Sequence, residues 1–75
     1  MKIELGNVAI GELFIHNGGL FVVLPFDYEE EKYYNLCIAT RNRDDYNATD
    51  KYYFDEKIMV EYLPSMVLKE FIPKE

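Results

Sequence analysis

Apolar residues are densest on either side of Asn17-Gly18-Gly19. Asn and Gly tolerate the positive φ angles that a tight hairpin turn requires. The pattern therefore predicts a β-hairpin with strands at residues 12–16 and 20–25. Both strands carry apolar residues on both faces, which is typical of strands that are covered on two sides. Closure into a small barrel, the C-terminal segment or another subunit would each cover the second face.

Shorter apolar runs elsewhere in the chain are separated by clusters of Gly, Asn, Asp and Pro, a pattern typical of strands and turns. Further strands are predicted at residues 2–5, 33–40, 51–54 and 58–63. Residues 66–72, between Pro64 and Pro73, are predicted to be a seventh strand or one turn of helix. Helical periodicity is nowhere longer than about two turns. The sequence thus predicts an all-β fold, either a small barrel or a curled antiparallel sheet of about five to seven short strands.

The length and composition predict one small domain. We expect the 75 residues to form a core over 3–63 and a C-terminal extension over 64–75. The single Cys37 excludes an internal disulfide, so the fold does not require an oxidising compartment. The apolar runs are too short for a signal peptide or a membrane span. We therefore expect a cytoplasmic protein without a membrane partner.

The chain is acidic, with 14 Asp and Glu against 8 Lys and Arg and a formal net charge of −6. Nucleic-acid-binding surfaces usually carry the opposite sign, because they must neutralise phosphates. We therefore expect no direct nucleic-acid partner.

The order of core and turn residues resembles a known family. The segments that carry the resemblance are V-x-I-G-E-L-F, N-G-G-L-F-V-V-L, Y-N-L-C-I-A-T and K-Y-Y-F-D-E-K-I-M-V-E-Y-L. They are similar to segments of small SH3-like barrel proteins encoded by bacteriophages and their bacterial hosts. The matching positions are Gly11, Phe14, Gly18, Phe21, Asn35, Val60 and Leu63. The resemblance implies an SH3-like barrel and an accessory protein of phage or prophage type, many of which bind a host protein.

The chain departs from that family pattern in an acidic loop at residues 27–31, a long connection at 41–50 and the tail after Pro64. Loops of this kind often carry function on a conserved scaffold. The connection at 41–50 is rich in Asp and Asn, but it lacks the Gly and Glu of a calcium-binding loop, so turn formation explains it better.

Candidates for catalysis or metal binding are few. His16 has no second His nearby, and a zinc site usually needs three or four ligands. Cys37 lies among apolar residues, where a free Cys behaves as a small buried hydrophobe. We predict that the protein is not an enzyme and that it uses neither a cofactor nor a metal.

In an antiparallel meander, successive loops alternate between the two ends of the strands. The turn at 17–19 and the loop at 41–50 should therefore share one end, and the loops at 26–32 and 55–57 the other. The second end gathers the acidic residues Asp27, Glu29, Glu30, Glu31, Asp55 and Glu56. We predict an acidic rim that docks on a basic surface of a partner protein. The alternative is that these residues are simply solvated.

Tyrosines are frequent in the chain, which contains seven of them. Tyr33-Tyr34 and Tyr52-Tyr53 are adjacent pairs in predicted strands, so one member of each pair points outward. We predict that Tyr33 and Tyr52 contribute to an exposed aromatic patch that contacts the partner. Cross-strand pairing within the sheet is the alternative.

These features together predict a non-enzymatic protein that binds a host protein and inhibits or modulates it through its acidic loops and exposed tyrosines. A homodimer is also predicted, because both faces of the central hairpin are apolar. One alternative is a small-ligand protein that binds a nucleotide signal, with Arg41 and Arg43 as the candidate phosphate ligands. Another is a structural or assembly component.

Overall fold

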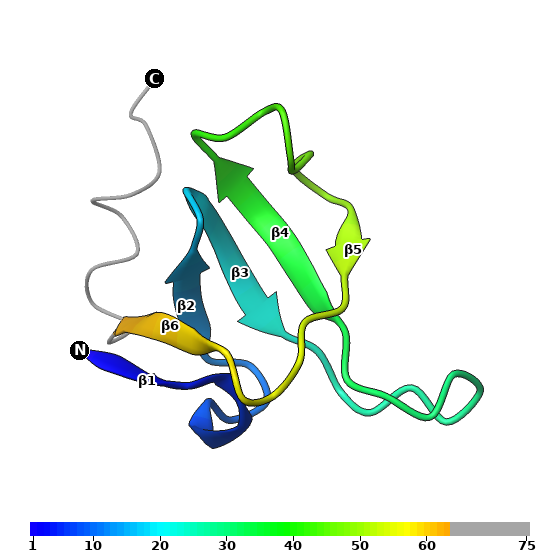
Figure 1. The fold of residues 1–75 in the computed structure, drawn as a ribbon. Helices are drawn as coiled ribbons and strands as arrows, with labels where there is room; N and C mark the ends of the chain where they lie inside the picture. The colour runs from blue at the N-terminus through cyan, green and yellow to red at the C-terminus, as the bar shows by residue number, and fades with distance from the viewer. Residues whose placement is uncertain (64–75) are drawn as a thin grey trace.

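The computed structural model describes residues 1–63, which fold into one antiparallel sheet (Figure 1). The strands are β1 (Lys2–Glu4), β2 (Leu13–His16), β3 (Gly19–Val23), β4 (Asn35–Thr40), β5 (Lys51–Tyr52) and β6 (Met59–Leu63), and one 3₁₀ turn, η1 (Leu5–Asn7), follows β1. Their order in the sheet is β1-β6-β2-β3-β4-β5. The predicted all-β fold is therefore confirmed. Residues 64–75, with the predicted element at 66–72, lie outside the described part of the chain.

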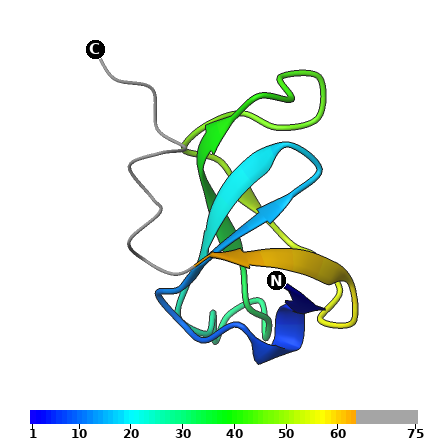
Figure 2. The same cartoon turned by 90° about the vertical axis from the view of Figure 1, so that its left-hand side faces the viewer.

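The sheet is curled but it does not close into a barrel. The outermost strands are β1 and β5, and neither pairs with the other within residues 1–63. The turned view shows a strong twist, since β6 runs across the direction of β4 (Figure 2). Of the two predicted architectures, the curled antiparallel sheet is the one that the structure adopts.

The central hairpin of β2 and β3 forms as predicted. Asn17 and Gly18 have φ angles of 48° and 84°, and His16 pairs with Gly19 across the turn. Positive φ at both central positions defines the two-residue turn whose twist matches that of the strands it joins. A tight Asn-Gly turn therefore sets the register that places Phe14 opposite Phe21.

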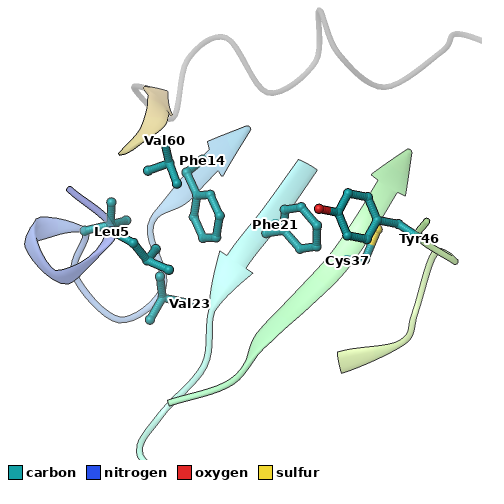
Figure 3. Close-up of a cluster of buried hydrophobic side chains, with 8 residues drawn as sticks. Leu5, Phe14, Phe21, Val23, Cys37, Tyr46 and Val60 are labelled. Carbon is teal, nitrogen blue, oxygen red and sulfur yellow. The ribbon is translucent and has the colours of Figure 1, made fainter. Parts of the chain in front are cut away.

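An aromatic cluster on one face of the sheet forms the main core. The rings of Phe14 and Phe21 stack with their centroids 5.3 Å apart, and Tyr46 and Phe54 pack edge-on against Phe21. Leu5 and Val60 lie near Phe14, and Cys37 lies near Tyr46 (Figure 3). Aromatic pairs with these geometries stabilise a core beyond the area they bury. The sequence thus packs a large aromatic core into a very small sheet.

The second face of the hairpin is also covered. Leu13 and Leu20 are buried on the face opposite the aromatic cluster, and Leu20 has no exposed surface. Their cross-strand partners Val22 and Ile15 are half-buried, so the predicted cover of the second face is confirmed only in part. Barrel closure, one of the three predicted coverings, does not occur, because the sheet remains open.

Strand ends differ from the predicted ranges by at most two residues. The predicted third strand reached Pro25, whereas β3 ends at Val23. Beyond it the Leu24 N–H still bonds to the Tyr34 carbonyl, and Asp27 forms an isolated bridge with Lys32. The strand predicted at 51–54 is shorter in the structure, where β5 ends at Tyr52. The chain leaves the sheet there, and the Phe54 ring packs against the core. Among the residues that the structure covers, no helix has the length and apolar character that a bilayer crossing requires.

Candidate protein-binding surface

Two loops at one end of the sheet line a shallow hollow. The connection between β3 and β4 projects from the same end as the connection between β5 and β6 (Figure 1). The hollow, here called the loop hollow, has a volume of about 410 Å³ and is lined by Phe26, Glu31, Tyr33, Tyr53, Asp55 and Glu56, among others. The structure thus brings together the two acidic segments that the meander was predicted to place at one end.

The other end of the sheet is formed by the hairpin turn and the loop at 41–50, again as predicted. The Asn17 side chain donates a hydrogen bond to Asp45 Oδ2 over 3.1 Å, and the Arg41 N–H donates to the Gly18 carbonyl over 2.9 Å. The two arginines considered for phosphate binding are therefore remote from the loop hollow along the strands.

Asp27 organises the first acidic loop. Its Oδ1 accepts the backbone N–H groups of Glu29 and Glu30, each over 3.0 Å, and its backbone pairs with that of Lys32. A carboxylate that bonds backbone groups two residues on is a common way to close a turn. Glu31 then adopts a positive φ of 56° to complete the reversal. Asp27 is therefore engaged within the loop, while the glutamates that follow it face outward.

Backbone hydrogen bonds hold the second acidic loop, residues 55–57, against η1. The Gly6 N–H donates to the Glu56 carbonyl over 2.8 Å, and the Leu5 N–H donates to the Ile58 carbonyl over 2.9 Å. Asp55 Oδ1 accepts the backbone N–H of Lys57 over 2.8 Å. The backbone of this loop is thus held in place, and it presents the exposed Glu56 side chain at the surface.

Glu29, Glu31 and Glu56 make no close ion pair among the described residues. Within residues 1–63 none of the three side chains makes a hydrogen bond or ion pair, and the one ion pair there joins the N-terminus to Glu61. Residues 26–32 and 55–57 carry six carboxylates against two lysines, whereas the loop at 41–50 carries three against two arginines. The first end therefore has the more negative potential, which attracts basic surfaces.

Two lysines lie over aromatic rings: Lys32, which lines the loop hollow, and Lys51 on β5. Lys32 Nζ is 4.7 Å from the centroid of Tyr53, and Lys51 Nζ is 5.0 Å from the centroid of Tyr34. Both distances lie within the range of a cation–π attraction. The lysines therefore contribute to a stack of alternating lysine and tyrosine side chains beside the loop hollow.

Exposed aromatic side chains surround the acidic loops. Tyr28, Tyr33 and Tyr53 are 85%, 49% and 54% exposed. The rings of Tyr28 and Tyr33 each pack edge-on against Phe26, with centroid distances of 5.0 Å. Tyr33 is therefore placed at the surface, as predicted, and it lies in a small aromatic group built on Phe26.

The structure corrects the predicted orientation of Tyr52. This residue lies opposite Asn35 on the buried face, its ring packs 5.1 Å from that of Tyr46, and its hydroxyl accepts the Asn47 N–H over 2.7 Å. Because side chains alternate along the chain, Tyr53 is the outward member of the pair. Tyr52 thus belongs to the core, and Tyr53 takes the surface position.

Sequence reasoning overlooked Phe26, Tyr28 and the contribution of η1. Phe26 and Tyr28 flank Asp27 in the projecting loop. The only sign of their role in the sequence is that aromatic residues alternate with an acidic residue in a segment that is not predicted to be a strand. Cys37 is a buried core residue, and His16 is half-buried with its ring against Phe54. Burial raises the pKa of the Cys37 thiol, and no three His, Cys, Asp or Glu side chains within residues 1–63 are placed to hold a metal.

No known protein family, no curated protein and no solved structure matches this chain. The fold and the surface therefore define its class only as a small all-β protein built on one open antiparallel sheet.

Proposed function

We propose that this chain is a non-enzymatic binding protein that docks on a basic surface of another protein through its acidic loop end. The observation that supports this proposal is the arrangement of three unpaired carboxylates, Glu29, Glu31 and Glu56, around exposed tyrosines. Tyrosine is enriched in protein interfaces because its ring is apolar and its hydroxyl is polar. Complementary charge accelerates encounter and favours the correct partner.

The resemblance to phage-encoded SH3-like proteins suggests what kind of partner this is. An accessory protein of phage or prophage type would bind a protein of the bacterial host and inhibit or modulate it. The net charge of −6 fits a host surface that is itself basic, such as one that normally holds nucleic acid. Occupying that surface would block its normal ligand.

Affinity capture from a bacterial lysate tests the proposal when two charge-matched variants are compared. The site variant carries Glu29→Lys and Glu31→Lys, and the control carries Asp44→Lys and Asp50→Lys in the loop at the opposite end. All four side chains are exposed, and none makes a hydrogen bond or ion pair within residues 1–63. Both variants change the net charge equally, so only the position of the charge differs.

We expect the wild type and the control variant to retain the same host protein, and the site variant to bind the purified partner about tenfold more weakly or worse. Equal binding by the site variant would contradict the proposal. So would an equal loss in both variants, because that result would reflect net charge rather than a surface.

A further inference from the structure

The second face of the sheet, opposite the aromatic cluster, is apolar across its central strands. Side chains alternate between the two faces of a strand, so the register assigns six apolar residues to this face: Leu13, Ile15, Leu20, Val22, Leu36 and Ile38. Leu20 has no exposed surface and Leu13 has 8%, whereas the other four are half-buried. Neighbours within a sheet shield the flanks of a side chain, and full burial of its end requires cover from outside the sheet.

The described residues outside the strands contribute to the other face. Leu5 of η1, Tyr46 of the loop at 41–50 and Phe54 all pack in the aromatic cluster. The connection between β3 and β4 projects beyond the end of the sheet (Figure 1). All six strands lie in one sheet, so no strand of residues 1–63 forms a second layer. The cover of the second face is therefore to be sought in the segment that follows β6.

That segment begins beside the second face. β6 ends at Leu63, which pairs with Leu13 and shares its face. Strands β2, β3 and β4 follow β6 in the sheet, so three strand spacings, about 14 Å in all, separate β6 from β4. Five extended residues span about 17 Å, so the chain after Leu63 is long enough to cross this face. Five of the residues at 66–72 are apolar: Met66, Val67, Leu68, Phe71 and Ile72.

We propose that residues 66–72 pack against the second face of their own chain. Apolar side chains of the segment would cover apolar side chains of the sheet, which is the main driving force for such contacts. A short tether gives an effective concentration in the millimolar range, and this favours the chain's own segment over a second copy in dilute solution. The inference goes beyond the proposed function and does not depend on it, because it concerns the face of the sheet and not the acidic loop end.

Nuclear Overhauser effects in the full chain, labelled with ¹³C at its methyl groups, test the proposal. We expect contacts between side chains of residues 66–72 and the methyl groups of Leu13, Leu20 or Val22. We expect no contacts from these side chains to the methyl groups of Val60, which is buried in the cluster on the other face. Absence of any contact between residues 66–72 and the second face would overturn the proposal.

A mixture of labelled and unlabelled chains identifies which chain supplies the cover. An isotope-filtered measurement on an equal mixture detects only contacts between copies, and we expect it to detect none. Contacts between copies at the second face would overturn the proposal, because the occupant would then be a second copy.

Two double variants of the full chain measure what the contact contributes. Leu68 and Ile72 are four residues apart, so they share a face whether the segment is a strand or a turn of helix. Leu68→Ser with Ile72→Ser should raise the equilibrium constant for unfolding about tenfold or more, because both apolar contacts are lost. Lys69→Ser with Glu70→Ser changes the same segment at constant net charge and should raise it less than about threefold.

Urea denaturation of both variants gives the two equilibrium constants. Equal effects of the two double variants would overturn the proposal, because the apolar residues of the segment would then contribute no more than its charged ones. The Overhauser measurement uses the unaltered chain, so it decides the question even where a variant fails to fold.

Discussion

Gly19 begins β3 directly beside two aromatic rings. A Cβ atom at this position would lie 2.7 Å from Cε2 of Phe21 and 3.0 Å from Cδ2 of Tyr46. Both rings belong to the packed core and have little room to move. We predict that Gly19→Ala lowers the free energy of unfolding by about 1–3 kcal/mol, the usual cost of overpacking a core. Urea denaturation monitored by tyrosine fluorescence measures the change.

Gly11 supplies the control for that substitution. It has a φ of 84°, but no atom lies within 4 Å of a Cβ placed there. Asn tolerates this backbone conformation, so Gly11→Asn should change the free energy of unfolding by less than Gly19→Ala does. Equal losses in the two variants would show that Gly19 is not limited by space.

The adjacent residues Tyr52 and Tyr53 differ in what their hydroxyl groups do. The Tyr52 hydroxyl accepts the Asn47 N–H, whereas Tyr53 is 54% exposed. We predict that Tyr52→Phe lowers the free energy of unfolding by about 0.5–1.5 kcal/mol, because it removes a hydrogen bond of ordinary strength. Tyr53→Phe should be neutral. Thermal denaturation of both variants measures the two changes in stability. A larger loss of stability in Tyr53→Phe than in Tyr52→Phe would contradict the inward position of Tyr52.

His16 should make stability depend on pH near neutrality. Its ring packs edge-on against Phe54, and burial, with a smaller contribution from the charge of Lys2, lowers its pKa below the ordinary value of 6.5. As the pH falls through that value, the unfolded chain takes up the proton before the folded chain does. The free energy of unfolding should therefore decrease with falling pH in this range.

The His16→Gln variant isolates this effect. Glu12 and Glu61 also have lowered pKa values, through hydrogen bonds from Tyr62 and from the N-terminus, but they titrate below 4.5 and affect only more acidic solutions. Urea denaturation at about pH 7.5 and pH 5.5 should show a decrease in the wild type that is smaller in the variant. If the free energy of unfolding decreases equally in the wild type and the variant, titratable groups other than His16 cause the pH dependence.

The loop between β3 and β4 depends on one carboxylate for its shape. Asp27 accepts the N–H groups of both Glu29 and Glu30. We predict that Asp27→Ala makes these two amides exchange with solvent several-fold faster, because each loses its acceptor. Amide hydrogen exchange followed by nuclear magnetic resonance measures the rates. The Glu29→Gln variant, which keeps Asp27, should exchange like the wild type, and unchanged rates in Asp27→Ala would contradict this description of the loop.

The strands were predictable from sequence to the extent that local signals determine them. Asn17-Gly18 marks the central turn, and the apolar runs beside it mark β2 and β3. The end of β5 was not predictable, because Phe54 leaves the strand to pack against Phe21, a contact between residues far apart in the chain. The open form of the sheet likewise depends on pairing between distant strands.

The candidate surface was predictable in its position and only partly in its residues. The prediction assumed a meander, and this holds from β2 to β5 but not for β6, which pairs with β1 and β2 instead of β5. The two acidic segments nevertheless line one hollow. The choice between Tyr52 and Tyr53 required the pairing of β5 with β4, because Tyr52 faces inward through its position opposite Asn35. The structural role of Asp27 depends on the fold of its own loop, and composition alone does not distinguish it from the neighbouring glutamates.

Across the whole molecule, the two ends of the sheet differ in what they present. One end carries the acidic loops, the exposed tyrosines and the loop hollow. The other end consists of the hairpin turn and the loop at 41–50, whose Asn and Asp side chains bond to one another. This division predicts that a partner contacts one end of the molecule.

Hydrogen exchange of the chain in complex with its captured partner tests that division most directly. We predict that binding protects the backbone amides of residues 26–34 and 53–58, and that the amides of residues 17–18 and 41–50 exchange as in the free protein. Protection of residues 17–18 and 41–50 without protection of the acidic loops would contradict the account.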